Sequence, residues 1–179
     1  MPTIANMSKV NGIVISGSPA VPDAHVLIAT ATASSSATLS FTLGLDSLYD
    51  IYQFRFMNMH PATANQTFGF QVNAAGASGF NETITSTAFQ AYHTADDGAQ
   101  GFGYHAAIDQ AQGTAYQILT TDVYNDNDLG ASGVLTLYAP SSTTYVKHFT
   151  SRVQAASSVG SVEKYIAGYI NVTAAIDEI

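Results

Sequence analysis

Residues 133–152, GVLTLYAPSSTTYVKHFTSR, constrain the fold more than any other stretch, because they hold two β-favouring runs around a break. The first run, Gly133–Ala139, is rich in β-branched, aliphatic and aromatic residues. Pro140 has no N–H for a strand ladder, and the two serines after it compete for local hydrogen bonds. A second β-favouring run, Thr143–Val153, follows. The stretch therefore predicts an antiparallel hairpin.

The second run of this hairpin has two distinct faces, because side chains alternate across a strand. One face carries Tyr145, Lys147, Phe149, Ser151 and Val153, and the other carries Val146, His148, Thr150 and Arg152. The first set is richer in large apolar groups. We therefore expect a half-buried hairpin.

Similar β-favouring runs recur along the rest of the chain, separated by Gly, Ser and Asn turns. We predict further strands at His25–Thr32, Ala37–Leu43, Tyr49–Asn58, Thr67–Asn73, Thr83–Thr94, Tyr116–Val123 and Val162–Thr173. Tyr49–Asn58 is apolar on both faces and should be central. Thr83–Thr94 also fits a short helix, but its threonines favour a strand. Gly168 indicates a bulge or a close backbone approach.

This spacing of strands predicts an all-β fold, an antiparallel β-sandwich with jelly-roll-like connectivity. We expect eight to ten strands, small polar connections such as Ala155–Ser161, and no helix longer than two turns. A chain of 179 residues suits one such domain, assigned here to residues 23–179.

Residues 1–22 are predicted to form a separate N-terminal hairpin arm and linker. Asn11-Gly12 stands between two β-prone runs, which is a strong signal for a type I′ turn. A lone hairpin is marginal in water, so it needs a surface to lie on. It is read as a flap on its own domain, an assembly arm or a disordered segment. As an arm, its partner-binding residues would be Ile4, Met7, Val10, Ile13, Val14 and Ile15.

Composition excludes several function classes. Charged residues make up only 10% of the chain, against about 25% in ordinary soluble proteins. The formal net charge of −8 argues against nucleic acid as a partner, because phosphate binding needs clustered cations. There is no cysteine, so disulfides and thiolate chemistry are excluded. No signal peptide pattern and no apolar run of membrane-spanning length is visible, so no membrane partner is expected.

No stretch carries a strong catalytic or metal-binding motif. The five histidines (His25, His60, His93, His105 and His148) have no recognisable ligand spacing. Asp122, Asp126, Asp128 and Gly130 partly match a calcium loop, but an acidic turn is the preferred interpretation. We therefore expect a non-enzymatic protein with no catalytic residue, no metal site and no cofactor.

Several segments resemble virion structural proteins of tailed bacteriophages. They are LIATATASSSATLSFT, YDIYQFRFMNMHPAT, GFNETITSTAFQAYH, LTLYAPSSTTYVKHFTSR and AGYINVTAAIDEI, and the resemblance covers about residues 26–179. The resemblance implies a jelly-roll-like sandwich located in the virion, commonly a homotrimer, used for capsid decoration or in tail and fibre appendages. It supplies no active-site residues.

The resulting functional prediction is a capsid decoration protein that binds and stabilises the shell. Its arm and the domain's underside would contact the major capsid protein or other virion proteins, and deleting residues 1–17 should leave a folded domain that no longer binds particles. The alternative is a tail, fibre or host-recognition module that binds carbohydrate through the loops Ala91–Tyr104 and Tyr124–Ser132. A depolymerase or glycosidase is the weakest hypothesis.

Overall fold

The computed structural model describes residues 7–14, as backbone, and residues 25–179. The regular secondary structure in this part of the chain consists of β-strands alone. They are β1 (Met7–Val14), β2 (Thr30–Ala31), β3 (Ile51–Met59), β4 (Gln66–Phe70), β5 (Asn73–Ala74), β6 (Ile84–Thr94), β7 (Gln100–Tyr104), β8 (Gln117–Val123), β9 (Gly130–Tyr138), β10 (Lys147–Ser157), β11 (Gly160–Ile170) and β12 (Ile176–Glu178).

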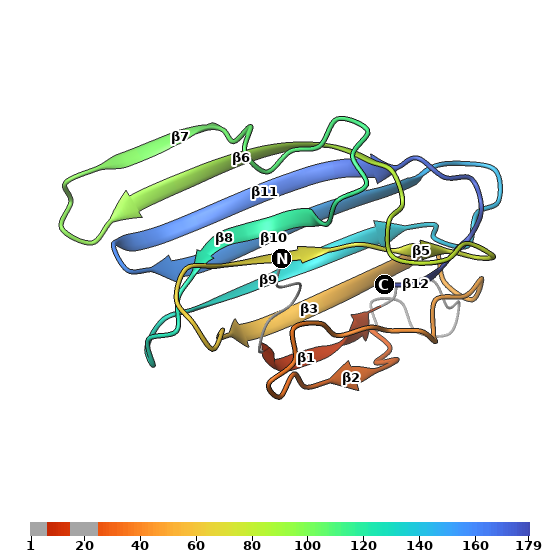
Figure 1. Ribbon diagram of the computed structural model, residues 1–179, viewed down its shortest axis with the longest axis horizontal. Helices are drawn as coiled ribbons and strands as arrows, with labels where there is room; N and C mark the ends of the chain where they lie inside the picture. Colours follow the sequence, from red (N-terminus) through yellow and green to blue (C-terminus); the bar gives the residue numbers. More distant parts are fainter. Residues whose placement is uncertain (1–6, 15–24) are drawn as a thin grey trace.

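Eight of these strands form one antiparallel main sheet in the order β2-β1-β3-β9-β10-β11-β6-β7. Two short antiparallel pairs, β4-β8 and β5-β12, form a second layer in front of it (Figure 1). The predicted all-β class and antiparallel sandwich architecture are confirmed. The strand order gives one large layer and one small layer. It does not by itself identify jelly-roll connectivity, which stays a prediction.

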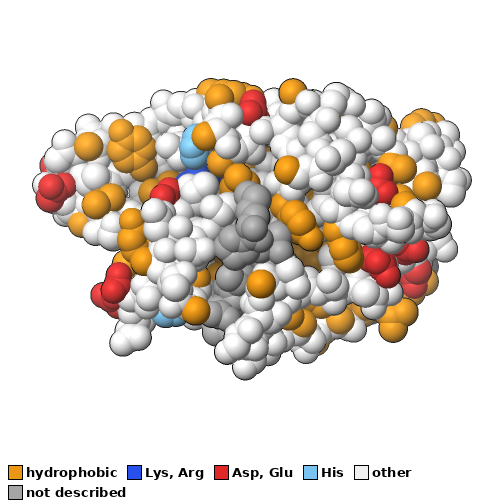
Figure 2. All heavy atoms as spheres, viewed as in Figure 1, with side chains coloured by type: hydrophobic (Ala, Val, Ile, Leu, Met, Phe, Trp, Pro, Cys, Tyr) orange, Lys and Arg blue, Asp and Glu red, His pale blue; other side chains and the backbone are white. Residues whose placement is uncertain are grey.

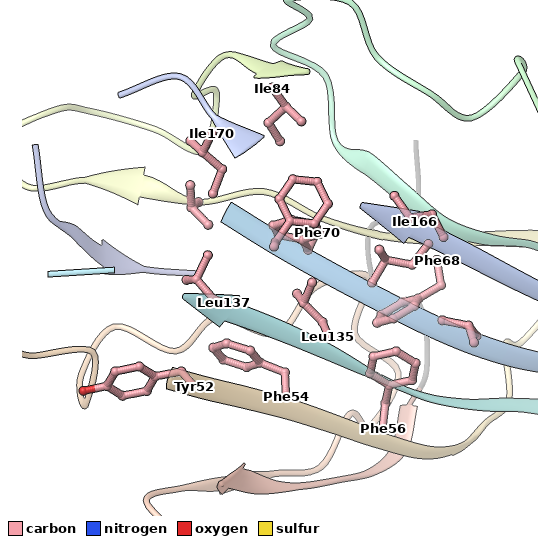
Figure 3. Close-up of a cluster of buried hydrophobic side chains, with 14 of the residues drawn as sticks. Tyr52, Phe54, Phe56, Phe68, Phe70, Ile84, Leu135, Leu137, Ile166 and Ile170 are labelled. Carbon is pink, nitrogen blue, oxygen red and sulfur yellow. The ribbon is translucent and has the colours of Figure 1, made fainter. Parts of the chain in front are cut away.

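The core lies between the two layers and is largely aromatic and aliphatic (Figure 3). Tyr52, Phe54 and Phe56 of β3 all point into it, as their alternation predicts. Phe56 packs edge-on against Phe68 of β4, with ring centroids 4.7 Å apart. Such pairs add to the stability gained from burying apolar area. The main sheet therefore has one face covered by the second layer, called here its inner face.

The predicted hairpin is present as β9 and β10, which pair from Phe149↔Leu137 to Ala156↔Gly130. Its two faces are as predicted for β10, where buried and exposed residues alternate. Tyr145 lies before the strand and is exposed. The prediction of a polar connection at Ala155–Ser161 is wrong, because β10 and β11 pair as far as Ser157↔Gly160. Small side chains such as Ala155, which is buried, suit a packed strand as well as a turn.

Two further predictions differ from the structure near the domain's start. The runs His25–Thr32 and Ala37–Leu43 contain one short strand between them, β2. Their alternation is nevertheless used for packing, because Leu39 and Phe41 lie against the core. Phe41 also exchanges backbone hydrogen bonds with Ile179, at 2.7 and 3.1 Å.

Strand β1 replaces the predicted N-terminal hairpin. It runs through Asn11-Gly12 without turning back and pairs with β3 from Met7↔Met59 to Val14↔Gln53. The register shifts between Val10 and Ile13, so Asn11-Gly12 provides a β-bulge instead of a hairpin turn. The predicted turn is wrong for this reason. The rest of the predicted arm and linker lies outside the described residues.

Candidate functional site

The residues predicted to bind a partner fall into two groups. Ile4 and Ile15 lie outside the described residues. Met7, Val10, Ile13 and Val14 belong to β1, which lies between β2 and β3. Their backbone is therefore part of the main sheet, and partner binding by these residues stays a prediction.

The outer face of the main sheet, opposite the second layer, is the most extensive candidate surface. Register places Tyr104, Phe89, Tyr165 and Arg152 directly opposite one another on β7, β6, β11 and β10. The next row along the strands is small, with Thr87, Ala167, Thr150 and Thr136. A row of large side chains thus runs beside a row of small ones, across the strands.

An aromatic patch lies at the β7 end of this face. We define it as Phe89, Phe102, Tyr104 and Tyr165. Phe102 is 75% exposed and Tyr104 is 60% exposed. Phe89 stacks on Tyr165 with ring centroids 4.8 Å apart, and Phe102 lies tilted against Phe89 at 5.3 Å. The patch is therefore a set of mutually supported rings on β6, β7 and β11.

Strand β7 gives this patch an open border, because it ends the strand order of the main sheet. In its residues QGFGY, two glycines alternate with Gln100, Phe102 and Tyr104. An exposed edge strand offers unpaired N–H and C=O groups to another chain. Backbone groups and aromatic side chains are therefore available together at this edge.

An ion pair borders the patch on β10 and β11. Arg152 Nε donates a hydrogen bond to Glu163 Oε1, and the Arg152 guanidinium lies 5.3 Å from the centre of the Tyr165 ring. The Arg152 hydrogen bond lowers the pKa of the Glu163 carboxyl, and the same bond raises the pKa of Arg152. Both faces of Tyr165 are thus engaged, one by Phe89 and one by Arg152.

A shallow groove of about 280 Å³ follows the two rows described above. Its walls include Phe89, Tyr165 and Arg152, and its floor includes Thr87, Thr136 and Thr150. Six neighbouring strands of the main sheet (β3, β9, β10, β11, β6 and β7) carry only one of the thirteen acidic residues in the chain, Glu163. Figure 2 shows the side of the molecule opposite this outer face, and on that side the acidic side chains lie mainly towards the ends of the molecule.

Two buried lysines point from the main sheet towards the second layer. Lys147 Nζ donates hydrogen bonds to the carbonyl oxygens of Tyr145, Val172 and Thr173 at 2.9–3.1 Å. Lys164 is 1% exposed, and burial lowers its pKa, an effect that Asp122 opposes. Lys147 is therefore a structural tie between β10 and the segment after β11.

His105 lies close enough to Lys164 and Asp122 to be affected by both charges. Burial and Lys164 lower the pKa of His105, whereas Asp122 raises it. Its Nδ1 atom is buried, and none of the described residues hydrogen-bonds to it. No hydrogen bond or ion pair joins these three side chains in the described part of the chain, so they do not form a nucleophile–base pair.

The acidic segment that partly matches a calcium loop is divided between two elements. Asp122 is in β8 and accepts a hydrogen bond from Thr121 Oγ1 at 2.6 Å. Asp126 begins a turn closed by the bond from Leu129 N to Asp126 O, at 3.0 Å. Among residues 25–179, no three His, Asp or Glu side chains come together as metal ligands would.

Of the two loops predicted to bind carbohydrate, one is mostly strand. Residues 91–104 include the end of β6 and all of β7, joined by residues 95–99. The aromatic patch escaped prediction because Gly101-Phe102-Gly103 is too short to indicate a strand alone. The alternation from Gln100 to Tyr104, next to the acidic turn Asp96-Asp97-Gly98, was the available signal.

Comparison with known proteins adds no family. No protein-family model, no curated protein and no solved structure matches the chain. The described residues contain no helix with the length and hydropathy of a membrane span.

Proposed function

We propose that this chain is a non-enzymatic structural protein of a bacteriophage virion, a capsid decoration protein. It docks on neighbouring virion subunits through the aromatic patch and the β7 edge. Three observations support the proposal: the resemblance of the segments in residues 26–179, the low content of charged residues, and the exposed patch. The patch carries the most weight, because it identifies a surface.

Exposed aromatic side chains at a sheet edge suit a protein partner. Aromatic residues are enriched where interfaces bury surface, and charged residues are depleted there. A partner strand added to β7 would gain backbone hydrogen bonds, while Phe102 and Tyr104 would supply apolar contact. We therefore propose the β7 edge as the docking element. Strand β1 is a less suitable one, because it already pairs within the main sheet.

Particles lacking the protein provide the test. Purified protein carrying Phe102→Ser should rebind to such particles at least about ten-fold more weakly than the natural chain, because one buried anchor commonly contributes more than 1.4 kcal/mol. Leu43→Ser is the matched control, since Leu43 is 82% exposed but lies outside the main sheet. Equal rebinding of the Phe102→Ser and natural proteins would refute docking through the patch.

A second candidate function, a tail, fibre or host-recognition module, is supported by a different observation. A polar hollow adjoins the segment Tyr124–Ser132, one of the two loops predicted to bind carbohydrate. Loss of glycan-array binding on altering this segment would support that candidate, and absence of any glycan or cell binding would count against it.

A further inference from the structure

The polar hollow and the aromatic patch lie on the same outer face of the main sheet, but over different strands. It has a volume of about 600 Å³ and is lined on β9 and β10 by Ser132, Gln154 and Ala156. Asn58, His60 and residues 127–130 complete the lining. Ligand sites typically measure roughly 300–1,000 Å³, so the hollow has room for one or two sugar rings.

Hydrogen bonds hold the rim of the hollow in place. The imidazole Nε2 of His60 lies 2.8 Å from the backbone oxygen of Asp126, and Asn125 Nδ2 donates to Ala62 O at 3.4 Å. Asn58 N donates to Ser132 Oγ at 3.0 Å. The acidic segment is thus tied to the end of β3. A rim fixed in this way reduces the entropy lost when a ligand binds.

The lining chemistry matches adjacent hydroxyl groups. Asn127 and Gln154 carry amides, which both donate and accept hydrogen bonds, and Asp128 carries a carboxylate, which accepts them. A sugar hydroxyl also donates and accepts. Gln154 Nε2 already donates to Ser161 Oγ at 3.3 Å, which fixes the amide with its oxygen as a remaining acceptor. Leu129 and Ala156 offer apolar contact for the C–H groups of a sugar ring.

The charge of the residues lining the hollow determines which polar ligands suit it. Neither lysine nor arginine lines the hollow, and Asp128 is its one carboxylate. A phosphate, sulfate or uronic acid would meet this carboxylate with no lysine or arginine in the lining to offset it. A neutral ligand rich in hydroxyl groups meets no such penalty.

We infer that this hollow is a binding site for a neutral saccharide. The inference names the ligand class of the host-recognition candidate and does not depend on docking through the patch. The hollow is built on β3, β9 and β10, whereas the patch is built on β6, β7 and β11. Strand β10 lies three strands from β7, or about 14 Å at about 4.8 Å per strand, so a partner strand added at the β7 edge does not contact the hollow.

The test is a titration of isotope-labelled full-length protein, followed by amide NMR. The sugars are glucose, galactose, mannose, N-acetylglucosamine and their disaccharides, with glucuronate as the charged comparator. At least one neutral sugar should shift the amide signals of Asn127, Asp128 and Gln154. Asp128→Ala and Gln154→Ala should each weaken that binding about ten-fold, as expected for loss of one good hydrogen bond.

Two control variants separate this inference from the proposed docking. Asp96→Ala removes an exposed carboxylate from the β6–β7 turn, which does not line the hollow, and should leave sugar binding unchanged. Phe102→Ser should weaken particle docking at least about ten-fold but leave the sugar-induced shifts intact. The inference is overturned if no neutral sugar shifts these signals at its highest soluble concentration, or if glucuronate binds more tightly than glucose.

Discussion

At the scale of single residues, the two buried lysines carry opposite consequences for stability. Lys147 is satisfied by three carbonyl oxygens, whereas Lys164 is buried and its pKa is lowered by that burial more than the Asp122 charge raises it. Burying an ammonium that is incompletely compensated is costly, and a buried carbonyl left without a donor is costly too.

We therefore predict that Lys147→Met lowers the free energy of unfolding by about 2–3 kcal/mol, because it leaves carbonyl groups after β11 without a donor. Lys164→Met should instead raise it by about 1 kcal/mol at pH 7, because an apolar chain of similar length replaces a buried ammonium whose desolvation outweighs its attraction to Asp122. Urea unfolding of both variants measures the difference. Equal destabilisation by the two substitutions would contradict the assignment.

The effect of Lys164→Met should depend on pH. The folded-state pKa of Lys164 lies below its ordinary value of 10.5, so the unfolded chain holds more protons between the two values. The natural protein therefore gains stability as pH rises through that window. The advantage of Lys164→Met should be greatest below the folded-state pKa and disappear above 10.5. An advantage independent of pH would show that the ammonium charge is not its cause.

Gly168 is a position where the close backbone approach expected from the sequence is found. A Cβ atom there would lie 2.5 Å from Thr85 O and 2.8 Å from the ring of Phe149. Gly168→Ala should therefore cost about 1–3 kcal/mol of stability, as overpacking commonly does. Gly103→Ala is the control, because nothing lies within 4 Å of its added Cβ. Thermal unfolding that ranks the two variants in the reverse order would refute the packing argument.

At the scale of elements, prediction succeeded where a strand is long and its pattern periodic. Tyr52, Phe54 and Phe56 alternate with more polar neighbours, and β3 is central and buried on the face they share. Prediction failed where tertiary pairing decides the conformation. Asn11-Gly12 is compatible with a turn or a bulge, and pairing of β1 with both β2 and β3 selects the bulge.

This placement of β1 changes the expected effect of truncation. The sequence alone predicts that removing residues 1–17 leaves a folded domain. With β1 inside the sheet, removing residues 1–14 should uncover the edge of β3 and promote aggregation. Hydrogen exchange of the β3 amides should become faster, while removal of residues 1–6 should leave them unchanged. Unaltered β3 protection after the longer deletion would show that β1 does not contribute to the sheet.

At the scale of the whole molecule, the fold class was readable from the sequence but the candidate surfaces were not. Strand composition and turn spacing specify an all-β sandwich. The patch and the hollow instead depend on register, which brings Phe89 beside Tyr165 across strands distant in sequence and Ser132 beside Gln154 across the β9–β10 hairpin. The sequence predicts the hairpin but not these side-chain pairs. The trimer implied by the resemblance is a further proposal, which analytical ultracentrifugation of the full chain tests.

The proposed function requires that this chain is part of a bacteriophage particle, and electron cryomicroscopy of that particle tests the proposal most directly. We predict density for many symmetric copies on the shell, with the β7 edge and the aromatic patch against neighbouring subunits. A particle without the chain, or copies confined to a tail or fibre tip, would contradict the decoration role. Shell-bound copies whose patch faces solvent would contradict docking through the patch.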